Sequence, residues 1–202
     1  MFLDLPYNFH WILPGEAARS AQAYAGFLAP FLRAHRIAAV VNLRGSNPGH
    51  LWWKYETRIC RKLDVVHRDV KLNSRQLPSK GMLLDLIGAF DSVPKPLLVK
   101  CSGGQDRTAF AAALLVLHRR GWHALVEAQQ QFAPWPYLHW PRRQQRWIRQ
   151  FPRFASESAC GKTLGAWLAH SYAAADFGAW LDARGESDSF KGLYGVRRET
   201  PP

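Results

Sequence analysis

The sequence predicts one α/β domain in which a central sheet is flanked by helices. Short apolar runs typical of buried strands alternate with longer segments of helical periodicity. A chain of 202 residues, 48% hydrophobic and 21% charged, has the length and composition of a globular protein with a substantial core. We therefore expect a single domain over residues 1–184 that ends in a helical extension, followed by a mobile tail over residues 185–202.

The first half of the chain contains two predicted helices and a strand. The apolar spacing of Ala18–His35 predicts an amphipathic helix, which Pro30 would break or divide into two pieces. Ala38–Leu43 has the character of a buried strand, and the Gly- and Asn-containing residues 44–49 follow it as a loop. Trp52–Leu63 predicts the next helix.

The order strand, helix, strand, helix continues from there. Val65–Val70 predicts a strand, and Ser79 is placed to cap a helix that runs to about Phe90. Pro96–Lys100 is a short apolar run typical of a buried strand, and Ala109–His118 is rich in the helix formers Ala and Leu. This order places loops at the carboxyl ends of strands, where open α/β sheets bind ligands.

The loop between the last strand and the last of these helices carries the most informative motif. It contains a cysteine, then five residues, then an arginine and a threonine: Cys101-Ser102-Gly103-Gly104-Gln105-Asp106-Arg107-Thr108. Where a strand ends and a helix begins, free backbone N–H groups and the positive end of the helix dipole converge. That setting binds phosphate and favours a thiolate over a thiol.

Each residue type in this loop has a chemical reason to be there. A thiolate at Cys101 can attack phosphorus, and the paired glycines allow the backbone N–H groups to point inward. Arg107 offers a planar fork to two phosphate oxygens and can stabilise the charge on the transferring group. The residues expected to bind the substrate phosphate are Lys100, Ser102, Gly103, Gly104, Gln105 and Thr108. The alternative is a glycine turn around a buried structural cysteine.

The loop resembles that of the cysteine-dependent phosphatases, which include the protein tyrosine and dual-specificity phosphatases. Asn8–Gly15 and Arg19–Gln22 are similar to the opening of bacterial dual-specificity-like enzymes, and Val40–Arg44 resembles their second characteristic strand. Ser74–Ser79 resembles the segment that leads into the helix before the loop. The resemblance covers residues 8–120. It implies a dual-specificity phosphatase-like fold, a phosphocysteine intermediate, and neither a metal nor an organic cofactor.

Two departures from the family pattern concern the nucleophile's neighbour and the general acid. The family usually has histidine before the cysteine, whereas this chain has Lys100, which supplies positive charge without the imidazole contact. Typical dual-specificity enzymes carry an acidic aspartate on a separate loop, and Asp69 lies at a comparable separation within a predicted strand. Asp69 is therefore one candidate for the general acid, although alignment would place Asn73 or Ser74 nearer to that role. The alternative for Asp69 is a surface carboxylate paired with Arg68 or Arg75.

Asp106 is the better candidate for the general acid. Its position before the loop arginine is similar to that in myotubularin-type lipid phosphatases, whose loop aspartate is implicated in protonating the leaving group. A carboxylic acid on the loop that encircles the phosphate can reach a leaving oxygen. The alternative is a structural acid bonded to Arg107 or to a loop amide. The resemblance also suggests that Asn42 supports the loop and that Arg44 is structural.

The charge balance favours anionic partners. Lys and Arg number 27 against 15 Asp and Glu, a formal net charge of +12. A phosphorylated protein or a phospholipid fits this charge, whereas nucleic acid is disfavoured because no nucleic-acid-binding module is recognisable. The three cysteines match neither a metal spacing nor a disulfide framework, and no signal peptide or membrane span is evident. We expect a cytoplasmic protein.

The segment Pro134–Arg153 combines tryptophans and arginines without an acidic residue. On a helix, Arg142, Arg146 and Arg149 would share one face, with large apolar side chains opposite. Such a helix either packs its apolar face on the core, which we favour, or rests on the inner face of an anionic membrane. Lys162–Arg184 predicts further helices.

The function predicted from the sequence is hydrolysis of phosphomonoesters, most like that of a dual-specificity or tyrosine protein phosphatase. A phospholipid headgroup phosphatase, acting on phosphatidylglycerophosphate or a phosphoinositide, is one alternative. A catalytically weak phosphate-binding module is the other.

Overall fold

The computed structural model describes residues 4–24 and 26–190. Its strands form one five-stranded sheet in the order β1-β2-β5-β3-β4, in which β1 pairs antiparallel with β2 and the other neighbours are parallel. Their bounds are β1 His10–Leu13, β2 Ala17–Ser20, β3 Ala39–Asn42, β4 Val66–Asp69 and β5 Leu97–Lys100. This arrangement confirms the predicted central sheet.

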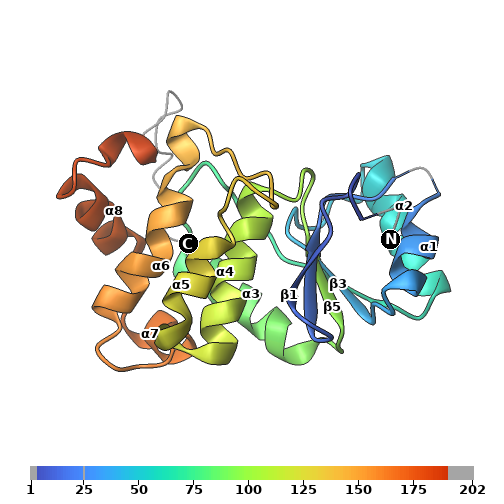
Figure 1. The fold of residues 1–202 in the computed structure, drawn as a ribbon, viewed down its shortest axis with the longest axis horizontal. Coiled ribbons are helices and arrows are strands. Elements are labelled where there is room, and N and C mark those ends of the chain that lie inside the picture. The colour runs from blue at the N-terminus through green and yellow to red at the C-terminus, as the bar shows by residue number, and fades with distance from the viewer. Residues whose placement is uncertain (1–3, 25, 191–202) are drawn as a thin grey trace.

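Helices cover both faces of the sheet (Figure 1). One face carries α1 (Leu28–Ala34) and α2 (Leu51–Lys62). The other side carries α3 (Lys80–Ser92), α4 (Asp106–Arg120), α5 (Leu125–Gln130), α6 (Trp147–Ser158), α7 (Leu164–His170) and α8 (Ala174–Asp182). Three short 3₁₀ helices complete the described chain: η1 (Trp122–Ala124), η2 (Arg143–Gln145) and η3 (Ser187–Ser189).

The strand β5 divides the core into two parts. Leu97 and Val99 join the larger hydrophobic cluster beneath α4, whereas Leu98 joins the smaller cluster beneath α1 and α2. Because successive strand residues face opposite ways, the first residue after β5, Cys101, falls on the α4 side and Lys100 on the α2 side. The alternation thus sends these two neighbouring side chains to different faces of the sheet.

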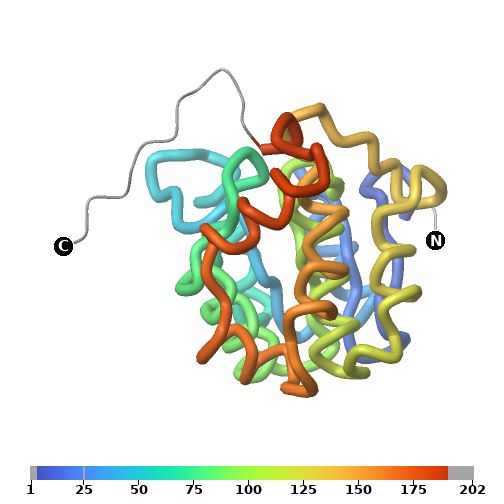
Figure 2. Tube along the Cα trace, turned by 90° about the vertical axis from the view of Figure 1, so that its left-hand side faces the viewer, coloured from blue at the N-terminus to red at the C-terminus, as the bar shows by residue number. Residues whose placement is uncertain are grey.

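Helix α4 is the central helix of the larger layer. It is buried at every position from Thr108 to Leu117, because it lies between the sheet and the outer helices. Its run of alanines allows these neighbours to approach closely. Figure 2 shows the C-terminal helices, in orange and red, standing in front of the sheet.

The prediction of a long helix over Ala18–His35 is wrong for the first half of that segment. Residues Ala17–Ser20 are fully buried and form β2, which pairs with β5 from Ala17 opposite Leu97 to Ser20 opposite Lys100. Pairing and burial therefore outweigh the helical spacing of this segment. The helix begins only at Leu28, and Pro30 is tolerated because it lies in the first turn, whose N–H groups lack helical partners.

Other predicted elements are confirmed within a few residues of their ends. The strand over Ala38–Leu43, the helix over Trp52–Leu63 and the strand near Val65–Val70 correspond to β3, α2 and β4. Ser79 caps α3 by accepting a hydrogen bond from the Met82 amide at 3.3 Å. The helix after the motif begins three residues earlier than expected, at Asp106.

The sequence predicted one helix that carries Arg142, Arg146 and Arg149 on one face, and the structure does not contain it. Arg142 precedes η2, and α6 begins only at Trp147. Arg149 is half-buried and donates to the carbonyl oxygens of His139, at 2.9 Å, and Phe132, at 3.4 Å. The three arginines therefore do not form one exposed helical stripe. The apolar side chains of α6 do pack on the core, as favoured.

The segment expected to be mobile begins at Gly185. Residues 185–190 are described, and they include η3 and Phe190, which packs against the larger hydrophobic cluster. Residues 191–202 lie outside the described residues, so mobility there stays a prediction. In the described part of the chain, no helix combines the length and apolar character needed to cross a membrane.

Candidate active site

The motif loop lies at the end of β5 and at the start of α4, as predicted. Cys101 is 3% exposed and sits at the base of a cavity of about 590 Å³. The loop lines this cavity with Cys101, Ser102, Gly103, Gln105, Asp106 and Arg107. Arg107 Nη2 donates to Ser102 Oγ at 3.2 Å. The candidate nucleophile Cys101, the Arg107 guanidinium and the candidate acid Asp106 thus line one cavity.

Gly104 and Thr108 lie behind the cavity wall. Gly104 has φ of +66°, and a Cβ on it would lie 2.6 Å from the Ala21 amide nitrogen and 2.8 Å from the Ser20 carbonyl carbon. The loop therefore packs directly on the end of β2. Thr108 is buried beneath the loop, and its hydroxyl has no hydrogen-bond partner among the described residues.

Side chains from the N-terminal segment hold the loop from behind. Asn8 Nδ2 and Arg19 Nη2 each donate to the Gly104 carbonyl oxygen at 3.2 Å, and the Gln22 amide donates to the Ser102 carbonyl oxygen at 3.1 Å. These bonds occupy carbonyl oxygens on the outer side of the loop. The family resemblance pointed to this segment, but it assigned no role to these residues.

Arg19 places a buried cation behind the loop. Its guanidinium also donates to the Gln131 backbone and side-chain oxygens, at 2.8 and 3.1 Å, and lies 4.3 Å from the centre of the Tyr137 ring. Burial lowers the pKa of Arg19 to about 10, so the group remains charged at neutral pH. A bound anion would be stabilised by this charge.

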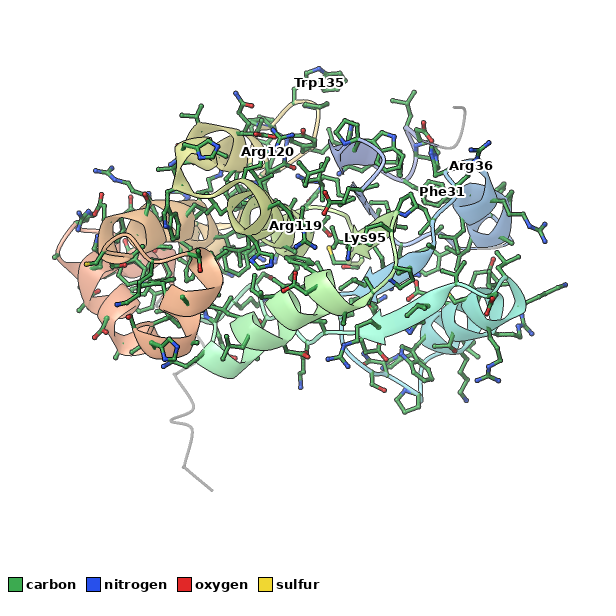
Figure 3. All side chains as sticks on the ribbon, turned by 90° about the horizontal axis from the view of Figure 1, so that it is seen from below. Phe31, Arg36, Lys95, Arg119, Arg120 and Trp135 are labelled. Atoms are coloured by element: carbon green, nitrogen blue, oxygen red, sulfur yellow. The ribbon has the colours of Figure 1, made fainter. Side chains whose placement is uncertain are left out.

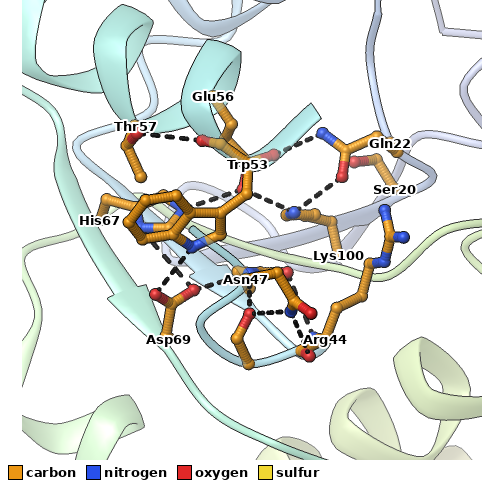
Figure 4. Close-up of polar contacts among 12 residues, drawn as sticks. Ser20, Gln22, Arg44, Asn47, Trp53, Glu56, Thr57, His67, Asp69 and Lys100 are labelled. Atoms are coloured by element: carbon orange, nitrogen blue, oxygen red, sulfur yellow. Dashed lines mark hydrogen bonds and ion pairs between the residues drawn. The ribbon is translucent and has the colours of Figure 1, made fainter. Parts of the chain in front are cut away.

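Lys100 points away from the cavity into a buried polar network (Figure 4). Its ammonium lies 2.5 Å from Glu56 Oε1 and 2.9 Å from Gln22 Oε1, while Glu56 also contacts His67 Nε2 at 2.8 Å and Gln22 Nε2 at 2.5 Å. The expected contact of Lys100 with the substrate phosphate therefore has no support here. Through Gln22, the network instead connects to the backbone of the motif loop.

Burial and pairing oppose each other in this network. Burial tends to raise the pKa of Glu56, but the hydrogen bond from His67 and the attraction of Lys100 outweigh it, so the pKa lies below its ordinary value. Burial lowers the pKa of Lys100, and the pair with Glu56 only partly offsets this. The pair thus depends on both partners, because either charge alone would be stranded in a site that is almost closed to water.

Asp69 does not line the cavity around Cys101. Its two carboxylate oxygens accept hydrogen bonds from Asn42 Nδ2, at 2.6 Å, and from Trp53 Nε1, at 2.9 Å. Asn42 in turn donates to the Gly45 carbonyl oxygen and organises the turn after β3. Arg44 stacks on the ring of Trp52 at 3.5 Å. Asp69 thus connects its own strand β4 to β3 and to α2.

Asp106 does line the cavity, and two residues that the sequence did not reveal contact it. Gln145 Nε2 donates to Asp106 Oδ2 at 3.0 Å, and His139 Nε2 lies 3.2 Å from Asp106 Oδ1. His139 is fully buried, and its Nδ1 lies 3.3 Å from the Phe132 carbonyl oxygen and 3.4 Å from Arg149 Nε. No sequence motif marks these residues, because they reach the loop only through the packing of the segment before α6.

The remaining wall of the cavity comes from two other segments. Leu72, Asn73, Ser74 and Arg75 form one part, and Trp140, Arg142 and Gln145 form the other. Asn73 and Ser74 thus lie at the cavity, whereas Asp69 does not. His67, Arg68 and Lys71 are not in this lining, and Arg68 pairs with Asp85.

Comparison with known proteins agrees with this fold. No protein-family model matches the chain, and no curated protein sequence matches it. Among solved structures it is similar to P. aeruginosa TpbA, with a TM-score of 0.59 and 16% identity over 83% of this chain and 94% of that one. It is also similar to the Yvh1 phosphatase domain from Chaetomium thermophilum, with a TM-score of 0.55 and 14% identity over 76% and 97%. The chain thus has the dual-specificity and tyrosine phosphatase-like fold.

The two glycines of the motif provide a matched test of loop packing. Gly104→Ala should abolish phosphate binding and turnover, because its Cβ would collide with the backbone at Ser20 and Ala21 and the residue has a positive φ. Gly103→Ala should lose far less, since the nearest atom to its Cβ is Gln105 Cδ at 4.0 Å. Phosphate binding by calorimetry measures both, and equal losses would contradict this account.

The contribution of the buried Lys100–Glu56 pair can be tested by measuring the free energy of unfolding. Glu56→Gln should lower the free energy of unfolding by about 3–5 kcal/mol at pH 7, because it strands the Lys100 charge. Since the folded pKa of Glu56 is depressed, its contribution is present above the unfolded value of about 4.3 and lost as pH falls through the folded pKa. Urea unfolding should therefore show the gap between parent and variant closing below about pH 4. A gap independent of pH would contradict the charge argument.

Proposed function

We propose that this chain hydrolyses phosphomonoesters through a phosphocysteine at Cys101. The observation that supports it best is the shared cavity of Cys101, Arg107 and Asp106 at the start of α4. In the proposed reaction, the Cys101 thiolate attacks phosphorus and the bond to the leaving oxygen breaks. Arg107 and the loop amides hold the phosphoryl oxygens. Water then attacks the phosphocysteine, releasing inorganic phosphate and the thiolate.

Cys60 is a useful contrast to Cys101. It is also buried, but it lies on α2 within the smaller hydrophobic cluster, where burial raises the pKa of its thiol to about 12, with the charge of Glu56 acting in the same direction. Such a group stays protonated and inert at neutral pH. The structural-cysteine alternative therefore suits Cys60 better than Cys101, which opens to a cavity and adjoins a helix start.

Asp106 supplies the proton to the leaving oxygen in this proposal, and His139 and Gln145 position its carboxyl group. Nε2 of His139 lies 3.2 Å from Oδ1 of Asp106, and Gln145 Nε2 donates to Oδ2 at 3.0 Å. These two neighbours limit how the carboxyl group can turn relative to the cavity.

The substrate class that we favour is a phosphorylated protein, as for a dual-specificity or tyrosine protein phosphatase. The enzyme would act on it in the cytoplasm. One of the similar structures is of a TpbA variant in complex with phosphotyrosine, with a TM-score of 0.51. A phospholipid headgroup is the second candidate. It is favoured by exposed tryptophans in one segment of the chain: Trp140, which lines the cavity, is 71% exposed, and Trp135 is 77% exposed and projects from the molecule in Figure 3.

The nucleophile is tested by substitution of cysteines at two sites. Cys101→Ser should abolish turnover of an aryl phosphate while retaining phosphate or vanadate binding, because a serine hydroxyl is not ionised near neutral pH. Cys160→Ser, at an exposed position, is the matched control and should keep full activity. Arg107→Lys should be severely impaired, since a point charge does not reproduce the guanidinium fork. Appreciable steady-state turnover by Cys101→Ser would overturn the mechanism, and a parent that binds phosphate without turnover would be the weak binding module.

The general acid is tested by leaving-group dependence. Asp106→Asn should lose on the order of 10²-fold more activity on an alkyl phosphate than on an aryl phosphate, whose leaving group needs little protonation. His139→Phe should show the same selective loss in milder form. Asp69→Asn should affect both substrates alike, because Asp69 anchors β4 to α2. If only Asp69→Asn showed the selective loss, Asp69 would be the general acid and the assignment to Asp106 would be wrong.

Contact with a membrane is tested with anionic vesicles. If Trp135 and Trp140 insert at the lipid interface, replacing both with Ala should weaken vesicle binding by at least about tenfold, since buried aromatic area is lost. Leu51→Ala, at a residue that is 83% exposed on α2, is the control and should bind as the parent does. Equal binding by all three proteins in a vesicle flotation assay would remove the argument for a membrane-bound substrate.

A further inference from the structure

Two arginines beyond the phosphatase motif line the same cavity as Cys101. Arg75 comes from the segment before α3, and Arg142 from the segment before η2. We infer that they form a second anion-binding subsite, so that the preferred substrate carries a second phosphate group besides the phosphomonoester that is cleaved. This inference rests on the proposed function, because the motif loop must take the first phosphate.

Hydrogen bonds hold the two segments that carry these arginines in a defined arrangement. Gln145 Nε2 donates to Ser74 Oγ at 2.9 Å as well as to Asp106, and its Oε1 accepts from the Arg142 amide at 3.2 Å. Trp147 Nε1 donates to the Ser74 carbonyl oxygen at 3.2 Å. These bonds join the segments of Arg75 and Arg142 to each other and to the motif loop. The two segments therefore make one wall with a defined position relative to Cys101.

The guanidinium groups of these two arginines are free to bind a ligand. Neither Arg75 nor Arg142 makes a side-chain hydrogen bond or ion pair with another described residue, whereas the neighbouring Arg143 pairs with Asp188 and Arg149 donates to backbone carbonyls. Within the described lining, Asp106 is the single acidic residue, and its oxygens face Gln145 and His139. Positive charge at this wall is therefore available to a ligand.

The cavity is larger and more basic than one phosphate requires. Its volume of about 590 Å³ falls in the range of sites that enclose whole small molecules, roughly 300–1,000 Å³. The motif loop and Arg107 already satisfy one phosphoryl group, which leaves two arginines for another anion. The indole of Trp140 lines the same space and offers an apolar surface to the carbon atoms that connect the two groups. A water-soluble bisphosphate and a phospholipid headgroup with both a phosphomonoester and a phosphodiester share this chemistry.

The test compares ligands with one and two phosphate groups. Binding to the full chain carrying Cys101→Ser is measured by calorimetry with methyl phosphate, with propane-1,3-diol bisphosphate and with a short-chain phosphatidylglycerophosphate below its micellar concentration. We expect at least one of the two-phosphate ligands to bind about tenfold or more tightly than methyl phosphate. Tight binding of the bisphosphate alone would identify a soluble source, and of the lipid alone a lipid source. No preference for either would overturn the inference.

Substitutions then locate the preference. Arg75→Gln and Arg142→Gln should each reduce the ratio of two-phosphate to one-phosphate affinity by several-fold, and together they should abolish it. Arg146→Gln removes the same charge from an exposed residue outside the cavity lining and should leave the ratio unchanged. Equal effects of all three substitutions would mean that only net charge matters, which would overturn the subsite. Aryl phosphate turnover by the parent is measured alongside: turnover without two-phosphate preference refutes the subsite alone, whereas absence of turnover refutes the proposed function.

Discussion

The close contact between the motif loop and the end of β2 is the constraint on which the rest of the site depends. Gly104 lies so near the backbone of Ser20 and Ala21 that no other side chain fits there. Its carbonyl oxygen is turned outward, where Asn8 and Arg19 bind it. Hydrogen bonds from outside the loop thus fix the orientation of this carbonyl group. The conformation of the loop therefore depends on packing at its rear as much as on its own sequence.

The network around Lys100 extends this support to the opposite face of the sheet. Lys100 occupies the position at which the resembled family usually has histidine, yet its side chain is directed toward α2 and pairs with Glu56. Gln22 contacts both charges and also donates its amide to the loop at Ser102. A buried pair of this kind contributes little net stability but is costly to break. Its value here is that it holds Gln22, and through it the loop, in one position.

Gln145 has the corresponding role at the mouth of the cavity. One amide side chain contacts the segment before α3, the candidate acid and the segment before η2. It therefore couples the residues that would do chemistry to the residues that would select the substrate. His139 reaches the same carboxylate from a fully buried position. The candidate acid is consequently held by groups far along the chain from the motif.

The sequence by itself determined the α/β class, the strand–loop–helix position of the motif and the candidate residues Cys101, Arg107 and Asp106, because each depends on local periodicity or on neighbours within a few positions. It also identified the Ser79 cap for the same reason. It misjudged Ala18–His35, since pairing of β2 with β5 is a contact between distant segments that overrides local preference. Only the tertiary structure decided the contacts of Asp69 and Lys100, the contacts of His139 and Gln145 with Asp106, and the placement of Arg75 and Arg142 on one cavity. Strand alternation and the packing of η2 on the loop before α3 set where those side chains point, and neither can be read from residues adjacent in the chain.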